Sequence, residues 1–226
     1  MSAANADLPV AVADPAAFII ANTVLLPVPL VPEISLHVAD EAVPLWTKTE
    51  DEINAIGLPP PFWAFAWAGG QALARYILDQ PETVSGKVVI DLASGSGIVA
   101  IAAARAGAAR VIAYDIDSFA RMAISLNARV NGVNVDVCSD DLLAEAAAPA
   151  AGTILAGDIF YESDTAKRAF DFLSMRAAQG ATVLIGDPGR SFLPKDRLRK
   201  IAEYQVPVSR ELEDADIKNT AVWEII

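Results

Sequence analysis

The chain has 226 residues, 54% of them hydrophobic, which is enough to bury one sizeable core in a single domain with an N-terminal extension. Its 17 Lys and Arg against 29 Asp and Glu give a net charge of −12, which disfavours nonspecific nucleic-acid binding and mildly favours basic partners. The single cysteine, Cys138, and single histidine, His37, exclude internal disulfides, zinc clusters and multi-histidine metal sites, and they suggest a reducing cytosol.

The N-terminal region holds an apolar run, residues 15–32, that prolines interrupt at positions 27, 29 and 32. No Lys or Arg precedes Lys48, so we expect neither a transmembrane helix nor a secretory signal. The pattern predicts a helix around residues 15–23 and then an extended edge segment to His37, an ordinary strand histidine. Residues 1–70 are predicted to form an extension that packs on the core and could serve as a lid over the site.

An aromatic block follows at residues 59–77, PPPFWAFAWAGGQALARYI, where a glycine pair opens a predicted helix. Aromatic faces attract cations by about 0.5 to 2 kcal/mol, so Trp67 could line the site of a cationic ligand. Phe62 and Phe65 are expected to pack in the core instead, where they would fasten the N-terminal segment to the sheet.

From Lys87 onward, short β-branched runs alternate with amphipathic helical stretches. Gly107 and Gly132 are expected to close two of these helices in the left-handed conformation. A helix near residues 194–203 and two β-prone runs, 203–212 and 219–226, predict an antiparallel C-terminal hairpin. The fold class is therefore α/β, a doubly wound, seven-stranded, mostly parallel sheet over residues 71–226. The five parallel strands are predicted at residues 87–92, 110–115, 134–139, 153–160 and 181–188, with helices at 98–107, 118–132 and 163–176.

Aspartates follow all five predicted parallel strands. In an open parallel sheet, ligands bind beyond the carboxyl ends of the strands, where the strand order reverses. Asp117 and Asp141 can also cap helices. Arg190 is the one cation at a strand end, where it could bind a substrate carboxylate or form an internal ion pair. The strand-end acids are Asp91, Asp115 with Asp117, Asp140 with Asp141, Asp158 and Asp187.

A glycine turn follows the first of these strands, and residues 95–100 fit the dinucleotide fingerprint G-x-G-x-x-G/A. The nearby acids would repel a pyrophosphate. No Lys or Arg occurs in the turn before Arg105 to offset this repulsion. S-adenosylmethionine carries an adenosine ribose and a positive charge, so it fits both the nucleoside-binding glycine turn and the surrounding acids. Amides near Gly95 and Gly97 could hold its carboxylate, while Asp115 accepts hydrogen bonds from the ribose. A dinucleotide-dependent oxidoreductase, or a cofactor-binding module without catalysis, is the alternative.

The DLASGSG stretch resembles the first motif of class I S-adenosylmethionine-dependent methyltransferases. Three further blocks, PPFWAFAWAGGQALARYILDQPETVSGK, GDIFYE and LIGDPGR, resemble the electron-transfer-flavoprotein β-subunit lysine methyltransferase family. This resemblance runs from about Val31 to the end of the chain. The family commonly has glycine where Ala93 stands and proline where Ala68 stands, so we expect Ala93 to tighten the cofactor loop and lower its affinity.

The resemblance implies an S-adenosylmethionine-dependent protein-lysine N-methyltransferase that acts on the electron-transfer flavoprotein β subunit or a ribosomal protein. Methyl transfer would be in line to a neutral amine, in the cytoplasm, with no nucleic-acid or membrane partner. A small-molecule amine N-methyltransferase resembling nicotinamide methyltransferases is the alternative. We predict no metal ligand, and we predict Asp158, Tyr161 and Asp187 as catalytic residues. The predicted cofactor-binding residues are Trp67, Asp91, Ser94, Gly95, Gly97, Asp115, Asp141 and Asp158.

Overall fold

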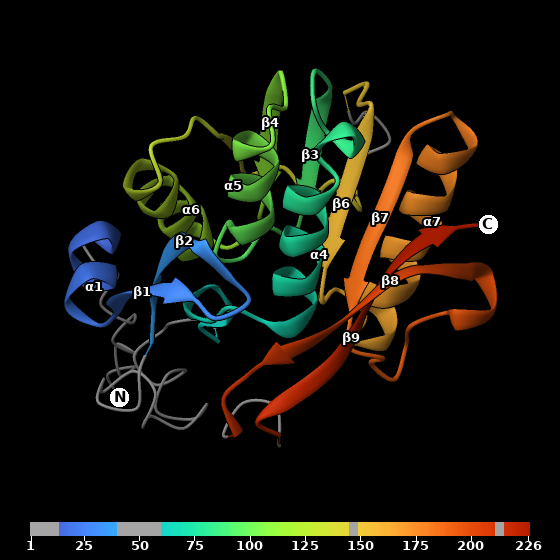
Figure 1. Cartoon of the computed structure of the whole chain (residues 1–226). Helices are drawn as coiled ribbons and strands as arrows, with labels where there is room; N and C mark the ends of the chain where they lie inside the picture. The colour runs from blue at the N-terminus through green and yellow to red at the C-terminus, as the bar shows by residue number, and fades with distance from the viewer. Residues whose placement is uncertain (1–13, 40–59, 145–148, 211–214) are drawn as a thin grey trace, which may run out of the picture.

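The computed structural model describes residues 14–39, 60–144, 149–210 and 215–226, which contain a two-stranded and a seven-stranded sheet (Figure 1). In the large sheet the strand order is β5-β4-β3-β6-β7-β9-β8, with β7, β9 and β8 paired antiparallel and the other pairs parallel. This arrangement confirms the predicted fold class. Its strands are β3 (Val88–Leu92), β4 (Arg110–Tyr114), β5 (Asp136–Cys138), β6 (Thr153–Gly157), β7 (Thr182–Asp187), β8 (Leu198–Pro207) and β9 (Ile217–Ile225).

Helices cover both faces of the sheet because alternate strand residues are buried on opposite sides. Val89 and Leu155 belong to one core cluster with α4, α5 and α6, whereas Ile90 and Ile154 belong to another with α7. Gly107 and Gly132 have φ values of 88° and 67°, which confirms their left-handed conformation after α5 and α6. The four helices are α4 (Ala68–Asp79), α5 (Ile98–Arg105), α6 (Ser118–Val130) and α7 (Ser163–Ala178).

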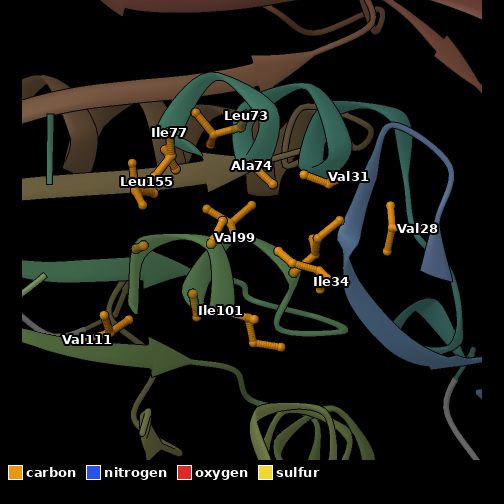
Figure 2. Close-up of a cluster of buried hydrophobic side chains, with 14 of the residues drawn as sticks. Val28, Val31, Ile34, Leu73, Ala74, Ile77, Val99, Ile101, Val111 and Leu155 are labelled. Atoms are coloured by element: carbon orange, nitrogen blue, oxygen red, sulfur yellow. The ribbon is translucent and has the colours of Figure 1, made fainter. Parts of the chain in front are cut away.

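The N-terminal residues add a helix and a hairpin to the α4–α5 face. Val31 and Ile34 of the hairpin are fully buried and cluster with Val99 of α5 and Ala74 of α4 (Figure 2). The hairpin is also fastened to α6, because the Asn127 side chain accepts a hydrogen bond from the His37 amide at 2.8 Å. The elements involved are α1 (Pro15–Ala21), β1 (Val24–Val28) and β2 (Val31–Val38).

One detail of the N-terminal prediction is corrected. The extended segment to His37 is not an edge of the main sheet but a separate antiparallel hairpin, since Pro27 and Val28 end β1 before a turn. His37 does lie in a strand, and its ring contacts the Thr23 hydroxyl at 3.3 Å. Residues 1–13 and 40–59 lie outside the described parts, so the extension over residues 1–70 and its action as a lid stay predictions. A boundary at residue 70 would fall within the first turn of α4.

The predicted helix near residues 194–203 is wrong. A short 3₁₀ turn, η3 (Lys195–Arg197), leads directly into β8, which pairs with β9 from Leu198 to Pro207. Apolar side chains at Leu198, Ile201 and Ala202 have helical spacing, but pairing with β9 satisfies their backbone groups as a strand. Two other 3₁₀ turns are η1 (Phe62–Ala64) and η2 (Pro81–Thr83).

Candidate active site

The parallel strands bring the predicted acids to one edge of the sheet. The strand order reverses between β3 and β6, which is the point where open α/β sheets bind ligands. Asp158 follows β6 directly, Asp115 follows β4, and Asp187 ends β7. The turn after β3 and Asp158 therefore flank the reversal.

The turn between β3 and α5 is shaped by two glycines with left-handed backbones. Gly95 has a φ of 56°, and Gly97, the N-cap of α5, has a φ of 84°. A Cβ added to Gly97 would lie 3.3 Å from Ile124 of α6, whereas one added to Gly95 would meet nothing within 4 Å. Gly97 thus allows close packing of α5 on α6, and Gly95 leaves open space beside the turn. The Gly97 amide donates to the Ser94 carbonyl at 2.9 Å, so it is not the free donor to a ligand carboxylate that the sequence suggested.

Asp91 lies beneath this turn and is 1% exposed. Its Oδ2 accepts hydrogen bonds from the Ser94 hydroxyl at 2.5 Å and from the Ala100 amide at 3.0 Å. Burial raises the pKa of Asp91 to about 7, against the opposing effect of these two donors. Asp91 and Ser94 therefore hold the turn and the start of α5 together, and their direct contact with a cofactor stays a prediction.

Asp115 closes the turn from the neighbouring strand. One carboxylate oxygen accepts the Gly95 amide and the other accepts the Asp117 amide, both at 2.9 Å. Burial raises the pKa of Asp115, and these amides oppose the rise. Each oxygen keeps a further lone pair with which it could accept a hydroxyl hydrogen bond. Beside it, the side chain of Ile116 is 71% exposed, an apolar surface that the sequence reasoning did not single out.

Ala93 is one of two described residues other than glycine with a left-handed backbone, and its φ is 52°. An alanine in this region is strained because its Cβ approaches the following carbonyl oxygen. A glycine would adopt this conformation without that strain, and the effect of Ala93 on cofactor affinity stays a prediction.

Asp158 is the other such residue, with a φ of 55° and 9% exposure. Its Oδ2 accepts the Gly70 amide of α4 at 2.8 Å, and its Oδ1 accepts Nε and Nη2 of Arg190 at 3.1 and 2.6 Å. Burial raises the pKa of Asp158 to about 6, while the Arg190 charge lowers it and the Asp187 charge raises it. Arg190 therefore forms the internal ion pair, one of the two roles considered from the sequence.

Glycines allow α4 to reach Asp158. A Cβ on Gly186 of β7 would lie 2.1 Å from the Gly69 carbonyl, and a Cβ on Gly157 of β6 would lie 3.1 Å from the Gly70 Cα. Real Cβ atoms essentially never show the first of these distances and rarely show the second, so α4 packs backbone to backbone on the two strands. The sequence showed the Gly69–Gly70 pair as a helix start, but gave no sign of its glycine partners in the sheet.

Asp187 shapes the turn that follows β7. Its Oδ1 accepts the amides of Gly189 and Arg190 at 2.6 and 2.7 Å, and it is fully buried. Its Oδ2 has no hydrogen-bond partner among the described residues. Burial raises the pKa of Asp187, against the effect of these amides and of Arg190. The structure therefore gives Asp187 a clear turn-forming function, and its catalytic role stays a prediction.

Aromatic rings cluster near the Asp158–Arg190 pair. Phe62 is 48% exposed, and its ring centroid lies 5.6 Å from that of Tyr161 and 6.2 Å from that of Trp67. The expectation that Phe62 packs in the core is wrong, because its η1 turn carries the ring outward, while Phe65, 8% exposed, is buried as predicted. Tyr161 is 50% exposed and Phe160 is fully buried. The Arg190 guanidinium lies 5.6 Å from the centre of the Trp67 ring.

Asp141 is held by two local partners. One oxygen accepts the Leu143 amide at 2.9 Å, and the other pairs with Arg168 of α7 at 2.9 Å. The described residues after it, 142–144, form a turn, and residues 145–148 of the expected helix lie outside the described parts. Asp117 caps α6 as predicted by accepting the Phe119 amide at 2.9 Å. A cofactor contact of Asp141 stays a prediction.

A separate cavity of about 460 Å³ lies at the opposite end of the sheet, around the start of β4, and it contains none of the predicted site residues. Among the described residues, no three His, Cys, Asp or Glu side chains gather as a metal site would need. No described helix has both the length and the apolar character needed to cross a membrane.

The chain matches a family model described as ribosomal protein L11 methyltransferase (PrmA) over residues 71–169. It is 37% identical over 200 residues to the electron transfer flavoprotein beta subunit lysine methyltransferase of Rattus norvegicus, covering 86% of this chain and 77% of the relative. It is 38% identical over 112 residues to the ribosomal protein L11 methyltransferase of Dechloromonas aromatica, covering 49% of this chain and 36% of that one.

Among solved structures, the fold resembles magnesium protoporphyrin IX methyltransferase from Synechocystis PCC 6803 with bound SAH. The TM-score is 0.50 at 14% identity, with 70% of this chain and 81% of that chain covered. These relatives favour neither the small-amine methyltransferase nor the dinucleotide-dependent oxidoreductase. The chain is a methyltransferase with a Rossmann-like class I fold, and it belongs to the electron transfer flavoprotein beta subunit lysine methyltransferase family.

Proposed function

We propose that the protein is an S-adenosylmethionine-dependent protein-lysine N-methyltransferase whose substrate is the β subunit of an electron transfer flavoprotein. The observation that carries this proposal is the 37% identity, over 86% of the chain, to the rat enzyme of that name. A ribosomal protein is the second candidate substrate, since the L11 methyltransferase relative and the family model cover about half of the chain.

The turn after β3 fits S-adenosylmethionine, which would supply a methyl group on a positively charged sulfur. Open space beside Gly95 leaves room for a ligand, and Asp115, which accepts the Gly95 amide, keeps lone pairs for ribose hydroxyls. Exposed Ile116 would give the base an apolar surface. The turn itself, residues 93–97, contains no Lys or Arg to bind a diphosphate.

The aromatic rings beside Asp158 fit a lysine side chain. Phe62 and Tyr161 are about half exposed and 5.6 Å apart, so their faces can contact a methylene stem. Asp158 would receive the amine at the end of this approach. Deprotonating a lysine with a pKa of about 10.4 at pH 7 costs roughly 4 to 5 kcal/mol, and a nearby carboxylate can take up the proton directly or through water.

Most of the rate enhancement should come from alignment. Holding two reacting groups in line can supply on the order of 7 to 11 kcal/mol, and no covalent enzyme intermediate is needed. Asp158 is suited to this task because both its oxygens are already anchored, by Gly70 and Arg190. We therefore propose Asp158 and Tyr161 as the residues that orient the amine, with Asp187 shaping the neighbouring turn.

The proposal is tested by incubating the protein with S-adenosylmethionine and, separately, a flavoprotein β subunit, ribosomal protein L11 and a mixture of small amines. Mass spectrometry should find methyl groups on lysines of the β subunit. Methylation of the small amines alone would contradict the proposal. So would calorimetry in which the protein binds NAD in preference to S-adenosylmethionine.

The matched variants are Asp158→Asn and Asp171→Asn. Asp171 is a 64% exposed partner of Lys167 on α7, outside the site, so its loss should leave activity unchanged. Asp158→Asn should lower kcat by about 10²-fold or more, as expected when a positioned proton acceptor is removed. Equal activity of the two variants would remove Asp158 from the mechanism.

We also propose that the protein works in the cytoplasm. Cys138 is a free, partly exposed thiol, which is suited to a reducing compartment. Cell fractionation with an antibody to the chain would test this, and recovery in an organelle fraction would contradict it.

A further inference from the structure

Arg190 is carried back toward the sheet by the turn after β7. The Asp187 carboxylate accepts the amides of both Gly189 and Arg190, and Gly189 has a left-handed φ of 93°. This turn directs the Arg190 side chain to Asp158 after β6. Two adjacent strand ends are thus joined through one buried carboxylate and one guanidinium.

The Asp158–Arg190 pair is largely buried, and hydrogen bonds fix its geometry. The side chains of Arg190 and Asp158 are 19% and 10% exposed, so water screens the pair less than a surface ion pair. Both Nε and Nη2 of Arg190 point to the same oxygen, while Gly70 donates to the other. The carboxylate plane is thereby fixed from two sides.

Few charged groups act on Asp158 from the packed elements. From the β7 turn, Arg190 favours the ionised carboxylate and Asp187 opposes it, and α4 contributes the Gly70 amide. Lys195 acts on Asp187, and Tyr161 lies three residues after Asp158. Burial has the largest effect and favours the neutral acid, so Arg190 is the main charge that holds Asp158 ionised near pH 7.

We propose that Arg190 is a positioning residue for methyl transfer, whose guanidinium orients the Asp158 carboxylate and keeps it charged so that it can receive the substrate amine. The inference rests on the proposed function, in which Asp158 faces that amine. Arg190 also lies over Trp67, so the same guanidinium fixes the carboxylate relative to the aromatic wall.

The test compares Arg190→Met and Arg190→Lys with wild type. Carbon-13 NMR of labelled aspartates, with Asp158 assigned from Asp158→Asn, should show wild-type Asp158 titrating near pH 6. Loss of an opposite charge at this distance should raise that midpoint by about 1 to 3 pH units in Arg190→Met, and Arg190→Lys should restore part of the difference.

Activity supplies the second readout. The dependence of log kcat/KM on pH should have a slope near one from the lysine amine, and it should steepen below the pKa of Asp158. In Arg190→Met, the pH at which the slope changes should rise. At pH 7, kcat should fall at least about tenfold, while KM for the protein substrate should change little. Arg197→Met is the matched control, because Arg197 lies 5.4 Å over the Phe170 ring and contacts no predicted site residue.

Two results would overturn the inference. The NMR midpoint of Asp158 could be the same in wild type and Arg190→Met, or Arg190→Met could lower KM without lowering kcat. The second result would mean that Arg190 competes with the substrate cation for Asp158. Absence of lysine methylation by wild type would instead contradict the proposed function, and the NMR titration would still decide whether Arg190 controls Asp158.

Discussion

The two halves of the site each contain a buried aspartate with different partners. In the cofactor half, formed by the β3 turn and the end of β4, Asp91 is 1% exposed and is held by a hydroxyl and an amide. In the acceptor half, formed by the ends of β6 and β7, Asp158 is 9% exposed and is held by an amide and Arg190.

This difference in partners determines how far the buried aspartate of each half is ionised at neutral pH. Burial raises the pKa of both acids, to about 7 for Asp91 and about 6 for Asp158, and Arg190 is the main force that lowers the second. Asp91 is therefore partly protonated at neutral pH and holds a turn through hydrogen bonds, which suits the carboxylate end of a ligand better than a fully charged acid would. Asp158 stays charged at neutral pH, which suits an incoming amine.

The largest effect is expected from disturbing the acceptor half sterically with Gly186→Ala. The new Cβ would lie 2.1 Å from the Gly69 carbonyl and 2.8 Å from the Leu73 Cβ, so α4 must move away from Asp158. We expect the free energy of unfolding, measured with urea, to fall by at least about 3 kcal/mol. The control is Gly152→Ala, which faces only the flexible Lys87 side chain and should cost less. Equal losses would show that the close packing of α4 is dispensable.

The same substitution in each half, Asp91→Asn and Asp158→Asn, should have unequal effects on stability at pH 8. An unfolded aspartate titrates near 3.9, so between that pH and about 7 the folded protein holds an extra proton on Asp91 and stability falls as pH rises. Asp91→Asn should remove this loss and raise the free energy of unfolding at pH 8 by about 1 to 3 kcal/mol.

Asp158→Asn should change stability at pH 8 by less than Asp91→Asn does. Burial raises the pKa of Asp158 too, so loss of its charge removes a burial cost, but the loss also leaves the partly buried Arg190 without its counter-charge. Urea unfolding at pH 5 and pH 8 measures both variants. If Asp91→Asn kept the pH slope of wild type, the raised pKa of Asp91 would be contradicted.

The sequence predicted the positions of the acids because strand ends follow from local patterns. Short β-branched apolar runs located β3, β4, β6 and β7, and parallel pairing then placed their last residues at one edge. It did not predict partners that come from distant elements. The contact of Gly70 with Asp158 spans 88 positions, and it depends on strand glycines with no local signal.

Burial also changed one electrostatic expectation. Asp91 was expected to repel a diphosphate as a charged acid, but its position beneath the turn favours the neutral form at about pH 7 and below. Two wrong predictions, a helix near residues 194–203 and burial of the Phe62 ring, have the same origin in contacts that the local sequence does not reveal. Pairing with β9 determines β8, and the η1 turn determines where Phe62 points.

The smallest effect concerns the cofactor half alone. Ala93→Gly should relieve the left-handed strain at φ 52° and raise the free energy of unfolding by about 1 kcal/mol, as well as tightening cofactor binding in calorimetry. Ala104→Gly, in the last turn of α5, is the matched control and should lose about 1 kcal/mol because glycine is a poor helix former. The acceptor half should be unaffected, so Asp158 should titrate near pH 6 in both variants. A shift of that titration in Ala93→Gly would show that the loop backbone couples the two halves and would contradict their independence.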